Sequence, residues 1–270
     1  MKLKWILMPP KPFTWLLTLI LAGVQLPWAQ AVAAEQAPVR VGYIEFPPYS
    51  YTDEQGQPSG HLLEFFELVA QRAGYRTQFI EYPSYRLFKT MESGLVDMSP
   101  SLVEHPVMSQ YTLRSRYLVA RVLLNLYYQD QPPPARLEEL RNTRLLLIQG
   151  LVYPGSPLAA VAENPANGVV TSTAPTHRAA AQMMHLRRAD YLLNYQDPAE
   201  SGFKEADLPV LPYITLLQQD FTMAFSLASP RARQLRDDFD SAIDALKAEN
   251  RLPQKYRTIF PYADAAPQPQ

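Results

Sequence analysis

The chain of 270 residues contains no cysteine. This absence excludes disulfides, thiolate metal sites, cysteine nucleophiles and a lipidated cysteine anchor. The sequence also lacks a run of basic residues, and its formal net charge is −1, which argues against nucleic acid as a partner. The apolar run at residues 13–26 is shorter than the ~20 residues that a membrane-spanning helix needs.

The composition is that of an ordinary globular protein, with 47% hydrophobic and 19% charged residues, enough for a sizeable core. The 26 prolines favour many loops and argue against long helical bundles. His177 and His185 match no zinc spacing, so we expect them at the surface or at a helix end. The sequence therefore predicts neither a metal site nor a cofactor.

Residues 1–34 have the three parts of a secretory signal peptide. Lysines lie in residues 1–12, the apolar run follows, and small residues with A-x-A spacing come last. We predict cleavage after Ala33 or Ala34. The product is expected in the periplasm, without a lipid anchor.

Residues 39–74 are the most informative stretch of the chain. Apolar and other residues alternate from Val39 to Phe46, which predicts a strand. Pro47-Pro48 end this strand, because proline cannot donate to a sheet ladder. A turn is expected at residues 53–56, and a helix with one apolar stripe is expected between Gly60 and Gly74.

Side chains at the carboxyl end of this strand are candidates for ligand contact, since ligands of open α/β sheets bind outside the carboxyl ends of strands. Glu45, Phe46, Tyr49 and Tyr51 are expected there, on backbone stiffened by the two prolines. The alternative is a strand that ends in a proline turn with core aromatics. For Phe46 taken alone, this alternative is the stronger interpretation.

The string of residues in this stretch, VG…PPYSY…G…G…E…A…G, resembles the opening of the type II periplasmic solute-binding proteins. Within them it resembles family 3, which contains the polar amino-acid receptors. Residues 93–97 resemble the family's GxxD motif, and residues 188–195 resemble its GxxDAxxxD strand. The resemblance covers nearly all of the chain after the leader.

This resemblance implies an α/β fold of the periplasmic-binding-protein-like type II class. Two α/β lobes would be joined by two crossover strands, with a ligand cleft between the lobes. The implied division is residues 35–126 for the first lobe, 127–221 for the second, 222–262 for a return strand and C-terminal helix of the first lobe, and 263–270 for a disordered tail. We expect a monomer.

Local signals add four expectations. Ser84 is expected to cap a short helix that ends at Gly94, and Asp97 is expected to be structural at a strand start. Residues 210–217 and 221–227 read as two separate strands. Ser229-Pro230 opens the longest helix.

Three departures from the amino-acid receptors bear on the ligand. Residues 103–107 replace the turn whose arginine grips the ligand's α-carboxylate. Residues 151–153 replace the hydroxyl side chains that follow Gly150 in the family. Tyr195 stands where the family has the acid that pairs with the ligand's ammonium group. These departures argue against an ordinary α-amino acid.

The predicted cleft is unusually aromatic, and its expected charges are Glu45 and Arg86. Arg86 could hold a carboxylate, or it could be a surface arginine in a loose salt bridge. We expect a small polar organic ligand, with a flat or cationic part held by stacking or cation–π contact. The candidate ligand-binding residues are Tyr43, Glu45, Phe46, Tyr49, Tyr51, Tyr82, Arg86, Ser99, Ser101, Tyr117, Gln149, Gly150, Tyr153 and Tyr195.

Three functions remain open. The first is capture of the ligand by lobe closure for an ABC-type importer, with an inner-membrane ABC permease or a sensor as partner. The second is a periplasmic enzyme on the same fold, similar to the cyclohexadienyl dehydratases, with Glu45 as general acid. No Ser/His/Asp arrangement, metal set or pair of carboxylates near the cleft is evident for it. The third is an orphan ligand sensor.

Overall fold

A computed structural model describes residues 37–256 and 260–261. The expected signal peptide and the expected tail at 263–270 lie outside the described residues. Among the helices that are described, none is both long enough and apolar enough to cross a bilayer.

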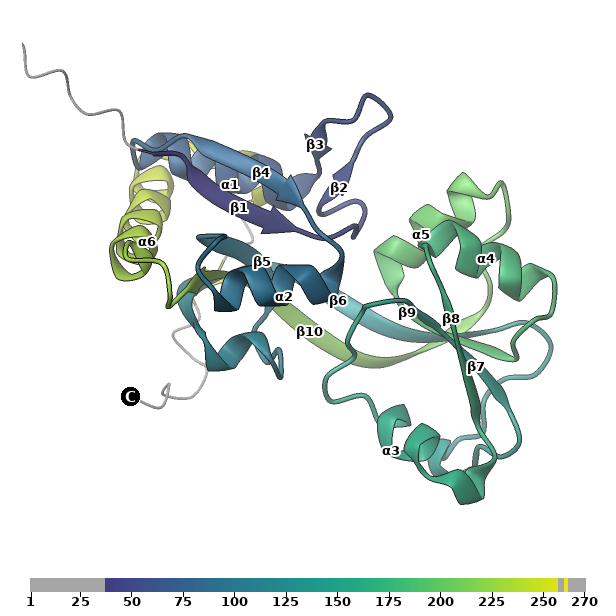
Figure 1. The fold of residues 1–270 in the computed structure, drawn as a ribbon. Coiled ribbons are helices and arrows are strands. Elements are labelled where there is room, and N and C mark those ends of the chain that lie inside the picture. The colour runs from purple at the N-terminus through teal and green to yellow at the C-terminus, as the bar shows by residue number, and fades with distance from the viewer. Residues whose placement is uncertain (1–36, 257–259, 262–270) are drawn as a thin grey trace, which may run out of the picture. The chain divides into compact units, whose positions relative to one another are not determined.

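The described elements alternate between strands and helices along most of the chain (Figure 1). The strands are β1 (Val39–Tyr43), β2 (Tyr51–Thr52), β3 (Pro58–Ser59), β4 (Thr77–Glu81), β5 (Met98–Leu102), β6 (Thr112–Tyr128), β7 (Arg144–Ile148), β8 (Val170–Ala174), β9 (Tyr191–Tyr195), β10 (Tyr213–Ser226) and β11 (Phe260–Pro261). The α-helices are α1 (His61–Arg72), α2 (Ser84–Glu92), α3 (Leu158–Glu163), α4 (His177–His185), α5 (Gln196–Glu205) and α6 (Ala232–Ala248). Short 3₁₀ helices are η1 (Met108–Gln110), η2 (Leu137–Glu139), η3 (Pro165–Asn167) and η4 (Gln254–Tyr256).

The main sheet has the strand order β4-β1-β5-β10-β6-β9-β7-β8, and β11 pairs with β6. Strands β4, β1 and β5 are parallel and form the sheet of the first lobe, and β9, β7 and β8 are parallel and form that of the second. The long strands β6 and β10 pair antiparallel with each other and connect the two lobes. The fold is therefore the expected two-lobed α/β fold with two crossover strands.

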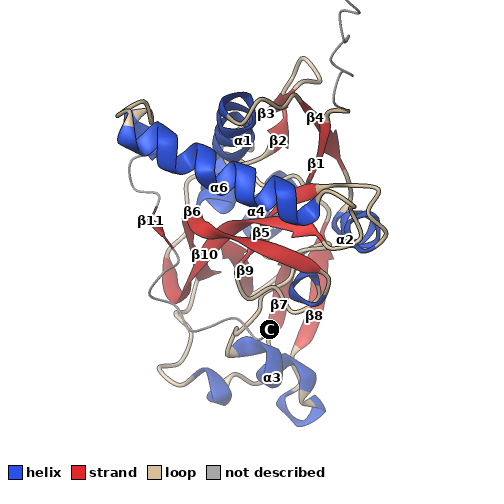
Figure 2. Ribbon diagram, turned by 90° about the vertical axis from the view of Figure 1, so that its left-hand side faces the viewer, coloured by secondary structure: helices blue, strands red, loops and turns tan. Residues whose placement is uncertain are grey.

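The first lobe is a sheet covered on both faces. One core cluster packs α1 and α6 on β1 and β5, around Phe66, Val69, Met98, Phe239 and Ile243. A second cluster lies under α2, with Leu87, Met91, Val96 and Met108. Parallel strands that are buried on both faces are typical of α/β folds. Figure 2 shows α6 lying across the sheet.

The second lobe buries α4 and α5 against β7 and β9, around Leu146, Met184, Leu192 and Phe203. The cluster on the opposite face includes Leu145, Leu158 and Tyr191 of this lobe, and it also contains Phe46 of the first lobe. The apolar contacts of the two lobes are therefore continuous.

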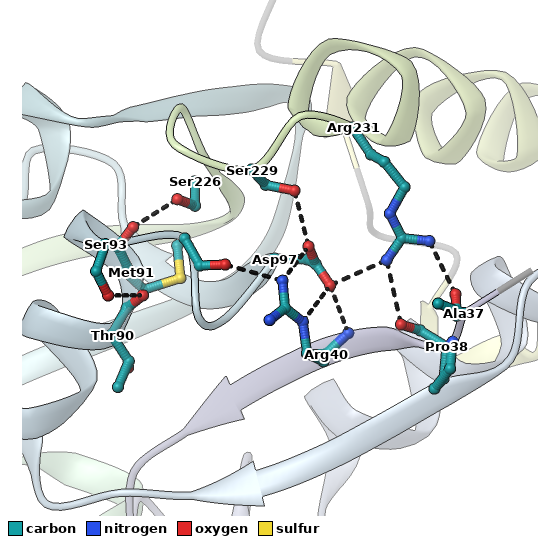
Figure 3. A network of polar contacts seen from close by, with 11 residues as sticks. Ala37, Pro38, Arg40, Thr90, Met91, Ser93, Asp97, Ser226, Ser229 and Arg231 are labelled. Atoms are coloured by element: carbon teal, nitrogen blue, oxygen red, sulfur yellow. Dashed lines mark hydrogen bonds and ion pairs between the residues drawn. The ribbon is translucent and has the colours of Figure 1, made fainter.

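A buried carboxylate ties the start of the described chain to α6 (Figure 3). Asp97 is fully buried, and it accepts hydrogen bonds from Arg40 Nε at 3.0 Å and Nη2 at 2.9 Å, from Ser229 Oγ at 2.7 Å and from Arg231 Nη2 at 3.1 Å. Burial alone would raise the pKa of Asp97, but the bonds from Arg40 and Ser229 outweigh it and lower the pKa. The structural role expected for Asp97 is confirmed.

Several expected elements are confirmed and others needed correction. Helix α1 ends before Gly74, which has a φ of 83°, and the apolar side of α6 is buried.

Ser84 is the first residue of α2 and does not cap it, because Pro83 occupies the cap position. The two strands expected at 210–217 and 221–227 form one strand, β10, which bends at register shifts. Helix α5 was missed. The residue boundaries of the lobes stay a prediction.

Candidate functional site

Phe46 lies at the centre of an aromatic cluster that joins the lobes. Its ring centroid is 5.3 Å from that of Tyr195, 5.5 Å from that of Phe221 and 5.7 Å from that of Tyr49. Tyr153 stacks on the far side of Tyr195 at 5.8 Å. Each such pair adds about 0.5–1.5 kcal/mol beyond simple burial. Lobe contact therefore has a large apolar component.

Tyrosine hydroxyls make the polar contacts around this cluster. Tyr49 Oη of the first lobe donates to a carboxylate oxygen of Asp197, which lies in the first turn of α5 in the second lobe. Tyr195 Oη lies 3.1 Å from the Val152 carbonyl oxygen and 2.9 Å from Gln219 Oε1. Gln219 belongs to β10, so the second lobe is tied to the crossover as well as to the first lobe.

A small cavity, which we call the apolar cavity, lies beside the cluster with a volume of about 50 Å³. Both lobes and the crossover line it. The lining residues are Ile44, Phe46, Ser50, Leu62, Leu87, Phe88, Pro100, Ser101, Leu102, His105, Met108, Gly150, Leu151, Val152, Tyr195 and Phe221. Such a volume holds a few water molecules or a small apolar group.

His105 is the one ionisable side chain other than a tyrosine that lines the apolar cavity, and it is 5% exposed. Its Nδ1 accepts the N–H groups of Val107 at 3.2 Å and Met108 at 3.1 Å, so the ring proton is on Nε2. Desolvation lowers the pKa of His105 to about 4. The ring is therefore neutral near pH 7, and its Nε2–H can donate a single hydrogen bond.

A second and more open cavity, which we call the acidic pocket, has a volume of about 380 Å³. Its lining residues are Ile44, Glu45, Glu81, Tyr82, Pro83, Ser84, Tyr85, Ile148, Gln149, Gly150, Leu151, Pro175 and His177. Both lobes again contribute. No lysine or arginine lines either the acidic pocket or the apolar cavity, although two carboxylic acids line the former.

Glu45 and Glu81 are brought together by strand register and by Thr52. β1 and β4 are parallel with Tyr43 opposite Glu81, so both strands end at the same edge of the sheet. Thr52 Oγ1 donates to Glu81, and its N–H donates to Glu45 Oε2 at 3.4 Å. No pair of carboxylates near the cleft was evident from the sequence. That expectation was wrong, because the register of two separate strands places Glu45 and Glu81 in one pocket.

Glu45 has an unusual pKa for an exposed carboxyl group. The pKa is raised to about 7, chiefly by desolvation and also by the neighbouring Glu81 and Glu205, while the Thr52 N–H acts in the opposite direction. Residue Glu45 is exposed as a whole, but nearby protein atoms partly desolvate its carboxyl group. It therefore changes charge close to neutral pH.

His177 lies at the first position of α4, as a helix-end histidine, but it is buried and not at the surface. Its Nδ1 is 3.0 Å from Asn194 Nδ2, and desolvation lowers the pKa to about 4. The Asn194 amide donates in this pair, which makes Nδ1 the acceptor. His177 therefore forms a neutral wall of the acidic pocket.

Gly150 of the second lobe lies close to Ser84 of α2. Its φ is +81°, and a Cβ built there would lie 3.1 Å from Ser84 Oγ. The backbone of this turn therefore requires glycine for its conformation, and the contact with α2 leaves little room for a side chain.

The structure brings nine of the fourteen candidate residues to this region. Phe46, Ser101, Gly150 and Tyr195 line the apolar cavity, and Glu45, Tyr82, Gln149 and Gly150 line the acidic pocket. Tyr49 belongs to the aromatic cluster. Tyr153 lies behind Tyr195 and accepts the N–H of Ile148 at 3.0 Å.

The other candidates lie elsewhere. Tyr43 is in the core and bonds Thr52, Tyr51 is in the β2–β3 hairpin, and the Ser99 hydroxyl donates to the Pro100 carbonyl oxygen at 3.0 Å. Arg86 is exposed on α2 and lines neither cavity. Tyr117 is buried under α6, where its hydroxyl donates to Asp244, because side chains alternate along β6 and this one faces the first-lobe core.

Residues of the region that were not among the candidates include Glu81, His105, Asp197 and Phe221. Glu81 lies at the carboxyl end of β4, which pairs with β1, and such strand ends are where ligands of open α/β sheets bind. No local sequence pattern marks Asp197 or Phe221. Asp197 is positioned by α5, which was not predicted, and Phe221 by the bend in β10. Among the described residues, no group of three or more His, Cys, Asp or Glu is arranged to hold a metal ion.

Comparison with known proteins agrees with this fold. The model of the bacterial extracellular solute-binding proteins, family 3, matches residues 39–261. No curated protein matches the sequence.

Solved structures of similar fold include a histidine kinase sensor domain with similarity to periplasmic binding proteins. It is 19% identical, with a TM-score of 0.66 over 84% of this chain and 99% of that one. A mutant of ArgBP from T. maritima is 16% identical, with a TM-score of 0.63 over 78% and 90% of the two chains. The ancestral amino acid-binding protein AncCDT-1, a precursor of cyclohexadienyl dehydratase, is 15% identical, with a TM-score of 0.60 over 79% and 91%.

Proposed function

Since the chain belongs to the bacterial extracellular solute-binding proteins, family 3, we propose that it is a periplasmic receptor that captures a small polar organic ligand by lobe closure. The observation that carries the proposal is the pair of cavities lined from both lobes. A ligand that touches both lobes favours the closed form by its differential affinity. We propose that an ABC-type importer in the inner membrane receives the ligand.

A thermal-shift screen of the mature chain tests ligand capture. A ligand at about 100 times its Kd stabilises the folded state by about 2.7 kcal/mol, which raises Tm by several degrees. A positive compound should also decrease the radius of gyration in X-ray scattering. A broad panel of amines, amino acids, organic acids and sugars that gives no shift would contradict the proposal.

A ligand sensor is the second candidate. It is favoured by the structural similarity to a histidine kinase sensor domain. The similarity extends over 99% of that domain, so the present fold is sufficient for a sensory module. The cavities would have the same role, but the closed form would contact a signalling protein. Co-purification of the liganded chain with a permease or with a sensor kinase from its own membrane separates the two.

An enzyme on this fold is the third candidate, favoured by the raised pKa of Glu45. A carboxyl group whose pKa is about 7 can act as a general acid near neutral pH. Turnover of prephenate or arogenate by the pure protein, lost in Glu45→Gln, would support this function.

A further inference from the structure

The two cavities adjoin but differ sharply in chemistry. Ile44, Gly150 and Leu151 line both of them, so a single ligand that reached past these residues would contact both cavities. One end of such a ligand meets aliphatic and aromatic side chains. The other end meets two carboxylic acids.

The apolar cavity offers nothing that could neutralise a negative charge. The hydroxyls of Ser50 and Ser101 donate to the carbonyl oxygens of Ile44 and Leu102 within the first lobe. The ring of His105 accepts two backbone N–H groups through Nδ1 and is neutral near pH 7. A carboxylate placed there would lose its hydration without gaining a cation, which costs several kcal/mol. This end of the ligand is therefore neutral.

The acidic pocket favours a positive charge. Glu45 and Glu81 line it, Glu205 of α5 acts on Glu45 from the second lobe, and no lysine or arginine lines the pocket. Tyr82 and Tyr85 add ring faces that can contact a cation. A carboxylate close to an ammonium group attracts it more strongly in partly solvated surroundings than in bulk water.

Taking the proposed solute capture as given, we propose that the ligand is an organic amine with a short apolar body and no carboxylate. Its ammonium group lies between Glu45 and Glu81, and its apolar body enters the apolar cavity. The volume of about 50 Å³ limits that body to a short group, unless the lobes separate further around a larger one. The site thus differs from one that grips both charges of an α-amino acid.

Matched ligands test the proposal without any mutation. Isopentylamine and L-leucine differ by one carboxylate, as do phenethylamine and L-phenylalanine. Calorimetric titration of the mature chain at about pH 8 should give at least one amine that binds about 100-fold more tightly than its amino acid, a difference of ~2.7 kcal/mol. Equal or tighter binding of the amino acids would overturn the proposal, and so would a failure of both amines to bind.

Amine binding by variants at several pH values tests whether Glu45 and Glu81 hold the ammonium group. Glu45→Gln and Glu81→Gln should each weaken amine binding about tenfold, whereas Glu67→Gln, at an exposed position of α1, should leave it unchanged. Alkylamines resemble lysine, whose pKa is ~10.4, and stay protonated between about pH 6 and 8. Affinity should therefore fall toward pH 6 in the wild type and in Glu81→Gln, as Glu45 takes up a proton, and should be nearly flat in Glu45→Gln.

The groups that face Glu45 are Glu81, Glu205, the neutral His177 and the Thr52 N–H, so no cation compensates for this titration. A wild-type affinity that is independent of pH, or equal affinity in all variants, would overturn the proposal. If amino acids bind and close the lobes, solute capture stands and the amine proposal fails. If no compound of the broader panel binds, the proposed function fails as well.

Discussion

The hydroxyl of Tyr49 donates a hydrogen bond to the carboxylate of Asp197 across the junction of the two lobes. Tyr49 is held by the Pro47-Pro48 segment after β1, and Asp197 by the first turn of α5. The N-terminal end of a helix favours a carboxylate. This bond is therefore one of the contacts that the molecule loses when its lobes separate.

Replacement Tyr49→Phe should shift the molecule toward the open form. It removes a hydrogen bond to a charged group, worth about 1.5 kcal/mol, and keeps the ring contacts with Phe46 and Phe221, so the ratio of open to closed forms should rise about tenfold. Because the chain has no cysteine, Glu67→Cys and Arg178→Cys give two unique labelling sites, one in each lobe. Energy transfer between the two dyes reports the lobe separation.

The matched control is Tyr75→Phe. Tyr75 donates to Asp238 at 2.6 Å, but both residues lie in the first lobe, away from the junction. The control should lower Tm without changing the dye separation. If Tyr49→Phe leaves the energy transfer unchanged, the bond does not contribute to closure.

Replacement Gly150→Ala should hinder closure as well as destabilise the fold. The positive φ alone costs about 1–2 kcal/mol for a residue with a Cβ, and the new methyl would press on Ser84 of α2. Gly56→Ala carries the same backbone cost at a φ of +75° with nothing within 4 Å of the added carbon. Only Gly150→Ala should increase the distance between the lobes. Adding Ser84→Gly to this variant should return the distance to the wild-type value. Equal dye separation in the two alanine variants would contradict this.

The stability of the protein should depend on the charge of Glu45. Its folded-state pKa of about 7 lies above the value of 4.5 in the unfolded chain, so its contribution is present below about pH 4.5 and is lost as the pH rises through 7. Glu45→Gln should therefore raise Tm at pH 8 and not at pH 4.5. Solvent screening keeps this rise to about 2 °C or less. A lower Tm at pH 8 would show that the charged form is stabilised.

Asp97 and Asp190 permit a test of how burial changes the value of an ion pair. Each carboxylate accepts hydrogen bonds from the backbone N–H and the guanidinium group of an arginine in a neighbouring strand. The arginine is Arg40 for Asp97 and Arg144 for Asp190. The side chain of Asp97 is 0% exposed, whereas that of Asp190 is 38% exposed. Asp97→Asn should cost about 3 kcal/mol and Asp190→Asn about 1 kcal/mol in the free energy of unfolding. Urea unfolding measures both. Equal losses would show that the Asp97 pair gains nothing from burial.

The pKa of Asp97 also predicts a limit at low pH. Because its folded-state pKa is lowered, the stabilisation is present above the ordinary value of 3.8 and is lost as the pH falls through the folded-state value. Unfolding of the wild type should therefore become easier below about pH 4, and this acid-dependent loss should be smaller in Asp97→Asn.

Elements whose apolar pattern and end signals lie within a few neighbouring residues were predicted best. Helix α1 and strand β1 were predicted well, because apolar spacing and the flanking glycines and prolines lie within or beside the elements themselves. Helix α5 was missed because a tyrosine-rich strand runs directly into it without a capping side chain. Strand β10 was divided in two because polar residues at 218–220 interrupt its apolar pattern at the crossover.

The sequence by itself determined the two-lobed fold and the aromatic, proline-stiffened rim at the end of β1, since periodicity and a family resemblance are both properties of the chain in order. Only the tertiary structure decided which side chains face one another. Parallel register placed Glu81 beside Glu45, a bend in β10 placed Phe221 against Phe46, and the alternation of β6 turned Tyr117 away from the cavities. These relations join residues that are far apart in sequence, and no local pattern records the register, the bend or the facing side of such elements.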